Sequence, residues 1–204
     1  MTSLTDIRTR SETAIIVRLF GLACMLGGLL WWLLNASEVI GIPLGPPVVG
    51  GVIGVVLLVG LTGGPLGLLA LRATGRLKTG LAGTAVTMVG LISYLTGQLL
   101  QTVFGFATQE IGIFYGAGAL LVGLGTLLLG IATILARRLS GWRRYAPLSV
   151  GAYYALMIPV QVVFFIGPNG APSSTLLAFW GFTWALLGYA IFTSASQPPH
   201  AQSS

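Results

Sequence analysis

Residues 111–135 read IGIFYGAGALLVGLGTLLLGIATIL and contain no charged side chain. A helix needs about 20 consecutive apolar residues to cross the hydrocarbon core of a bilayer. A membrane-spanning strand would be about ten residues long and would alternate apolar with polar side chains, which this stretch does not do. Because backbone groups in lipid must satisfy their own hydrogen bonds, the stretch predicts a transmembrane α-helix.

Five further stretches meet the same criterion. The six predicted spans are residues 14–34, 48–71, 81–104, 111–135, 148–166 and 174–193. Only 7% of the chain is charged, against about 25% in soluble domains, so lipid must cover much of its surface. We therefore expect an all-α integral membrane protein, a six-transmembrane-helix bundle with short loops. Residues 1–13 would form a cytoplasmic segment, and residues 194–204 a disordered cytoplasmic tail.

The positive charges predict how the chain is oriented. All ten lysines and arginines lie before or early in the first span, or in the second-to-third and fourth-to-fifth connections. They are Arg8, Arg10, Arg18, Arg72, Arg76, Lys78, Arg137, Arg138, Arg143 and Arg144. Since cytoplasmic loops carry an excess of Lys and Arg, both ends of the chain are expected in the cytoplasm. The basic turns also fit lipid headgroups, and membrane lipids are the expected partners.

The net charge of +6 is no sign of nucleic-acid binding here, because the chain has no soluble domain to carry the motifs such binding needs. Residues 71–77 (LRATGRL) and 137–143 (RRLSGWR) form two similar basic turns, either as a weak parallel repeat or by chance. In composition and topology the chain resembles small bacterial multi-pass membrane proteins. That resemblance implies a bacterial plasma (inner) membrane and transfers no site residue.

Small residues recur along the fourth span at alternating spacings of four and three, which places them on one helix face. They are Gly112, Gly116, Ala119, Gly123, Thr126 and Gly130. The face predicts close packing inside the bundle, with a homodimer interface as the alternative. In the second span Pro65 predicts a kink, and a binding site at an interrupted helix is the less favoured interpretation.

Polar side chains concentrate in the third and fifth spans. Gln98 and Gln161 each lie near the outer end of their span, so they are expected at similar depth. A candidate polar pocket between these spans comprises Tyr94, Gln98, Gln101, Tyr154 and Gln161, with Glu110 near its mouth. The alternative is a set of interhelical hydrogen bonds, worth about 0.6 kcal/mol each. Trp180 and Trp184 share a face of the last span, where core packing is favoured over stacking on a ligand.

The chain lacks most of the side chains that enzymes use within a membrane. Its only histidine is His200, in the tail, and its only cysteine is Cys24. A haem, an intramembrane metal site and a Ser–His hydrolase are therefore excluded, and no cofactor is expected. The favoured function is a non-enzymatic membrane subunit, scaffold, or binder of lipid or a small apolar ligand. The alternative is a facilitator of a small solute through the polar pocket; a lipid-modifying enzyme is less favoured. A homodimer or larger membrane complex fits the small-residue face.

Overall fold

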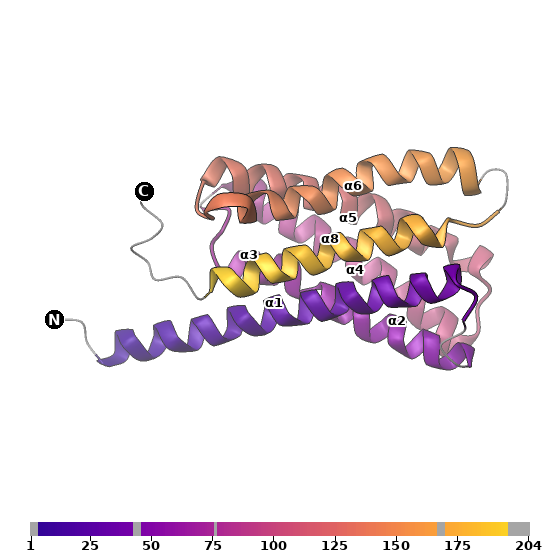
Figure 1. The fold of residues 1–204 in the computed structure, drawn as a ribbon, viewed down its shortest axis with the longest axis horizontal. Coiled ribbons are helices and arrows are strands. Elements are labelled where there is room, and N and C mark those ends of the chain that lie inside the picture. Colours follow the sequence, from indigo (N-terminus) through magenta and orange to yellow (C-terminus); the bar gives the residue numbers. More distant parts are fainter. Residues whose placement is uncertain (1–3, 43–45, 76, 167–169, 196–204) are drawn as a thin grey trace.

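The computed structural model describes residues 4–42, 46–75, 77–166 and 170–195, and these residues form helices joined by short turns, without a strand (Figure 1). The elements are α1 (Leu4–Val39), α2 (Pro47–Leu61), α3 (Gly63–Ala70), α4 (Lys78–Phe104), α5 (Thr108–Ala136), the 3₁₀-helix η1 (Gly141–Tyr145), α6 (Ala146–Gln161), the π-helix η2 (Val162–Ile166) and α8 (Ser174–Ser194). They provide six helical segments long and apolar enough to cross a membrane, which confirms the predicted helical class.

α1 is longer than the predicted span at both ends. It begins at Leu4, so the part of the predicted N-terminal segment that the structure describes is helix continuous with the span. At its other end the helix continues through Asn35 and Ser37, whose side chains donate hydrogen bonds to backbone carbonyls of the preceding turn over 2.9 and 2.7 Å. α8 ends at Ser194, and the predicted tail beyond Ala195 lies outside the described residues.

The second span is divided into α2 and α3 at Thr62. Pro65 has no N–H, so it cannot donate to the carbonyl one turn back. Thr62 keeps right-handed helical angles, φ −60° and ψ −24°, and its hydroxyl donates to the carbonyl oxygen of Val59 over 2.7 Å. The fifth span is also irregular, since α6 contains Pro159 and continues as η2.

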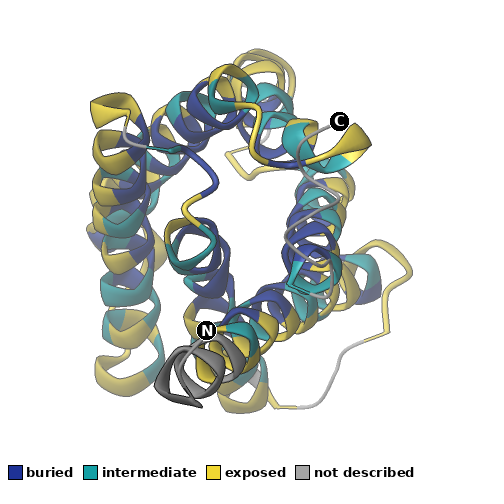
Figure 2. Cartoon of the chain, turned by 90° about the vertical axis from the view of Figure 1, so that its left-hand side faces the viewer, coloured by how far each residue is buried: buried dark blue, intermediate teal, exposed yellow. Residues whose placement is uncertain are grey.

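The six spans form a closed ring. α1 packs against α2 and α3, α2 against α4, α4 against α5, α5 against α6, α6 against α8, and α8 returns to α1. The end-on view of Figure 2 shows this ring, with buried segments facing inward and exposed segments facing outward. The two turns that hold most of the positive charges, residues 71–78 and 137–145, lie at one end, named the basic end from this point (Figure 1).

Glycines let α1 and α8 approach most closely, and this helix pair shares the largest contact in the bundle. A Cβ added to Gly21 would lie 2.9 Å from the carbonyl oxygen of Gly188, and one added to Gly181 would lie 2.8 Å from that of Gly28. The glycines are seven residues apart on each helix, so they line one face of each. α4 and α5 pack in the same way, because a Cβ on Gly90 would lie 2.7 Å from the backbone nitrogen of Val122.

The predicted small-residue face of α5 divides into two halves. A Cβ on Gly123 would lie 2.6 Å from the Tyr154 ring, and one on Gly130 would meet the backbone of Leu148, so this half packs against α6. Thr126 is also buried, and its hydroxyl bonds back to its own helix. The other half is open: Ala119 is half-buried, and Cβ atoms added to Gly112 and Gly116 would meet nothing within 4 Å.

Aromatic side chains fill the centre of the ring. The Trp180 ring is fully buried, with its centroid 5.0 Å from that of Trp31 and 4.9 Å from that of Tyr154. Trp184 is also fully buried and packs edge-to-face on Trp180 at 5.9 Å. Neither indole N–H of this pair has a hydrogen-bond acceptor among the described residues. The two tryptophans are therefore core residues, as the sequence favoured.

Candidate functional site

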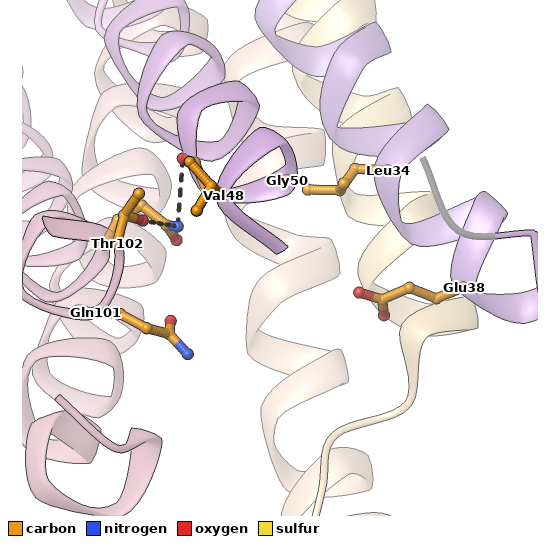
Figure 3. Close-up of a pocket in the computed structure, with 8 residues that line it drawn as sticks. Leu34, Glu38, Val48, Gly50, Gln101 and Thr102 are labelled. Atoms are coloured by element: carbon orange, nitrogen blue, oxygen red, sulfur yellow. Dashed lines mark hydrogen bonds between the residues drawn. The ribbon is translucent and has the colours of Figure 1, made fainter. Parts of the chain in front are cut away.

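A cavity of about 440 Å³ lies between α1, α2 and α4, at the end of the bundle opposite to the basic end (Figure 3). Its lining residues are Leu34, Glu38, Val48, Gly50, Gly51, Gln98, Gln101 and Thr102. This volume lies within the range of about 300–1,000 Å³ typical of small-molecule sites. One carboxylate, two amides and a hydroxyl lie among apolar and glycine residues, so the lining is mixed in polarity.

Gln98 is held by groups on three helices. Its Nε2 donates to Thr102 Oγ1 over 3.2 Å and to the carbonyl oxygen of Gly51 over 3.5 Å. Its Oε1 accepts a longer hydrogen bond, 3.5 Å, from the Tyr115 hydroxyl of α5. A Cβ added to Gly54 would lie 2.9 Å from the Gln98 amide carbon, so α2 needs glycine there to pass the amide. Gln98 is therefore an oriented side chain.

Gln101 lies one turn further along α4, at the exposed edge of the cavity. Its Oε1 accepts a 2.9 Å hydrogen bond from the Tyr115 hydroxyl, and its Nε2 donates to Thr108 Oγ1 over 3.1 Å. Tyr115 therefore contacts both amides of the cavity. The amide nitrogen of Gln101 carries a second hydrogen that can be donated to a ligand.

Glu38 supplies the negative charge of the cavity from the last turn of α1. Its carboxylate is exposed, and Oε2 accepts a 2.7 Å hydrogen bond from Ser174 Oγ at the start of α8. In Figure 3 its side chain and that of Gln101 point toward one another across the cavity. The nearest basic residue along its own helix is Arg18, about 30 Å away at the rise of an α-helix. The lysines and arginines of the two basic turns lie at the opposite end of the bundle, so no cation whose side chain the structure describes lies beside this carboxylate.

The predicted polar pocket is distributed over separate places in the structure. Gln98 and Gln101 line the cavity, as described above. Tyr94 and Tyr154 meet in the aromatic core, where their hydroxyl oxygens lie 2.6 Å apart in a hydrogen bond. The third and fifth spans therefore do touch, but they touch at the tyrosines and not at the glutamines.

Gln161 and Glu110 bind backbone groups at helix ends. Gln161 Nε2 donates to the carbonyl oxygen of Ser173 over 3.1 Å, and Oε1 accepts from the Ser173 N–H over 2.7 Å. Glu110 Oε2 accepts a 2.8 Å hydrogen bond from the backbone N–H of Ala107, the residue that caps α5. These bonds satisfy groups that helix termini leave unpaired, and neither side chain lines the cavity.

Sequence reasoning missed Thr102 as a member of the site. It considered that Glu38 and Glu110 could together bind a cation or a cationic ligand at the outer surface, but it favoured two solvated surface acids. Thr102 follows Gln98 by four residues, so the two share a face of α4. Gly51 and Gly54 lie three residues apart on α2 and mark the face that α4 approaches, because Cβ atoms added there would meet the side chains of Thr102 and Gln98. Two matching faces of this kind are a readable signal for the site. Glu38 gave no such signal, because an acid directly after an apolar run is also typical of a solvated helix end.

The predicted headgroup residues gather at the basic end. Arg72, Lys78, Arg137 and Arg138 are exposed, and Arg143 and Arg144 are half-buried. Arg76 lies outside the described residues.

The cavity offers hydrogen-bond acceptors and one net negative charge. Among the described residues no group of three or more His, Cys, Asp or Glu is placed to hold a metal ion. No family model, curated protein or solved structure matches the chain. The fold therefore defines the class: an all-helical chain with six helices long and apolar enough to cross a membrane, which is compatible with a multi-pass membrane protein.

Proposed function

We propose that the chain is a non-enzymatic integral membrane protein that binds a small, positively charged polar ligand in the cavity between α1, α2 and α4. The observation that carries the proposal is the uncompensated carboxylate of Glu38 facing the amide of Gln101 across a cavity of about 440 Å³. The carboxylate of Glu38 is an acceptor and the single charged group of the lining, so it favours a cation with N–H or N-methyl groups over an anion.

The membrane setting of this proposal rests on exposed apolar surface and on charge. Large apolar side chains face outward along the spans, for example Leu19, Leu120 and Leu156 at 59, 62 and 73% exposure. Water would not tolerate so large an apolar surface on a monomer. The basic end belongs on the cytoplasmic side, since Lys and Arg concentrate there. The cavity then faces the exterior, which is consistent with a receptor for an external ligand in a bacterial plasma membrane.

A panel of small ions tests the proposal through thermal stability in detergent. Methylammonium, tetramethylammonium and guanidinium are expected to raise the melting temperature of the wild-type protein, because a ligand that binds only the folded state stabilises it. Acetate and tert-butanol serve as anionic and neutral controls of similar size. Glu38→Gln keeps the size and the hydrogen bond to Ser174 but removes the charge, so the cation effect should disappear. Equal stabilisation of wild type and E38Q, or none by any cation, would contradict the proposal.

A second candidate function is facilitated passage of a small solute. It is favoured by the two irregular spans, the break at Thr62 and the π-helix that follows Pro159, because transporters place binding sites at interrupted helices. The fully buried Trp180 and Trp184 fill the bundle centre and oppose an open path. Flux of the same cations into liposomes separates the two functions: a binder gives no flux above empty vesicles, and a facilitator does.

A further inference from the structure

The two basic turns share one backbone feature, an arginine followed by a glycine with both residues at positive φ. Arg72 follows α3 and Arg137 follows α5, and both adopt left-handed angles, with φ of 50° and 51°. Each turn then places a glycine in the same region, Gly75 with φ 63° and Gly141 with φ 59°. The glycines are equivalent in the two similar segments, residues 71–77 and 137–143, but the positive-φ arginine lies three residues before the glycine in the first turn and four before it in the second.

Arginine is an unexpected residue at these two positions. A left-handed conformation brings the Cβ of an L-residue close to its own backbone, and glycine is the residue that normally occupies this position after a helix. Arg72 and Arg137 are the only described non-glycine residues with positive φ. Two strained arginines at matching helix ends indicate that their side chains are needed, since strain of this kind concentrates at functional positions.

The two turns lie side by side at the basic end. A Cβ added to Gly75 would lie 3.5 Å from Nε of Arg138, so a side chain of one turn reaches the backbone of the other. Arg72, Lys78, Arg137 and Arg138 are all exposed. The sequence has no acidic residue within 71–78 or 136–147, so neither turn carries a compensating charge. The result is a positive surface shared by α3, α4 and α5.

Exposed apolar side chains continue directly from this surface along the helices. Leu135 precedes the arginine pair of α5 and is 67% exposed, and Leu81 on the first turn of α4 is 63% exposed. On the second turn Trp142 and Tyr145 are exposed, and the Arg144 guanidinium lies 4.8 Å from the centre of the Tyr145 ring. In a lipid site the cations would bind the headgroup, the aromatic rings would lie at the membrane interface, and the aliphatic side chains would contact the acyl chains. A site for free phosphate would need only the cations.

We propose that the paired turns form a binding site for anionic lipid, in which Arg72, Arg137 and Arg138 hold the headgroup phosphate. This site is separate from the cavity at the opposite end, so it does not depend on the proposed ligand there. Its function would be to select acidic lipids around α3, α4 and α5.

Native mass spectrometry of the full-length protein, titrated in detergent with phosphatidylglycerol or phosphatidylcholine, tests the site. The wild type is expected to retain phosphatidylglycerol in preference to phosphatidylcholine. The double variant Arg72→Gly/Arg137→Gly removes two charges and relieves both strained conformations. It should lower phosphatidylglycerol affinity about five-fold for each charge, while the melting temperature in detergent stays unchanged or rises, because glycine accepts positive φ without strain.

Two controls make the result specific. Arg8→Gly/Arg10→Gly removes the same number of charges from the start of α1 and should leave lipid retention within about two-fold, because neither residue belongs to the turns that hold the headgroup. Inorganic phosphate at millimolar concentration should fail to displace the lipid. Unchanged phosphatidylglycerol retention in R72G/R137G, an equal loss in R8G/R10G, or displacement by phosphate would overturn the proposal. Because binding is measured in detergent, an altered membrane orientation of a variant cannot imitate the effect.

Discussion

Replacing Trp180 with alanine is expected to lower the free energy of unfolding by about 3–5 kcal/mol, the usual cost of deleting a buried Trp or Phe side chain. Trp180 is 0% exposed and contacts the rings of Trp31, Tyr94, Tyr154 and Trp184. In lipid the loss comes mainly from dispersion contacts, because apolar groups gain little by leaving hydrocarbon for the core. Unfolding by sodium dodecyl sulfate, followed by circular dichroism, measures it.

Its neighbour Phe179 provides the matched control. Phe179 is 58% exposed on the outer face of α8, so Phe179→Ala should change stability by less than about 1 kcal/mol. Trp180→Phe should fall between the two, because the indole N–H of Trp180 has no described acceptor and its removal breaks no hydrogen bond. If W180A and F179A destabilise equally, the aromatic core does not hold the ring together.

Gly28→Ala is expected to destabilise the bundle by about 3 kcal/mol, the upper end of what overpacking usually costs. The added Cβ would lie 2.6 Å from the carbonyl oxygen of Gly181 and would also meet the backbone nitrogen of Ala185. Both obstacles are backbone atoms of α8, so no side chain can move aside. α1 and α8 must separate, and dispersion contacts are lost along the whole helix pair.

The same substitution at Gly116 separates this effect from helix propensity. A Cβ there meets nothing within 4 Å, and alanine favours a helix over glycine by up to about 1 kcal/mol. Gly116→Ala should therefore be neutral or stabilising in the same unfolding assay. A loss at Gly116 would show that the open face of α5 is covered by another chain, and no loss at Gly28 would contradict the close packing of α1 on α8.

The six spans could be predicted from sequence because membrane thickness sets a minimum apolar length. The predicted and observed ends of the third span, for example, agree at Phe104. The short connections predicted that spans adjacent in sequence are neighbours in space, and the ring confirms this. The closing contact between α1 and α8 could not be predicted, because small-residue spacing identifies a packing face without identifying its partner. Gly21 and Gly28 carry the same spacing of seven as Gly181 and Gly188, yet only the structure shows that these pairs meet.

The candidate site, like the fold, could be predicted from the sequence only in part. Counting residues from the span ends predicted that Gln98 and Gln161 lie at a similar depth in the membrane. Depth does not specify where around the ring of helices a side chain lies. α5 lies between α4 and α6, so the two glutamines are on helices that are not neighbours in the ring. Gln98 then faces α2, and Gln161 turns to the backbone of Ser173. Glu38 lines the cavity because α1 continues as a helix beyond its predicted apolar run, to Val39.

Thiol labelling in intact cells tests the central claim of an outward-facing, electronegative cavity. Gly50→Cys places a thiol in the lining where an added Cβ meets nothing within 4 Å, and the native Cys24 is fully buried. The cationic reagent trimethylammonium-ethyl methanethiosulfonate should modify this thiol about ten-fold faster than the anionic sulfonatoethyl reagent, since a charged cleft concentrates ions of opposite sign. Adding Glu38→Gln should abolish the difference. No modification from outside the cell, or equal rates with both reagents when Glu38 is present, would contradict the account.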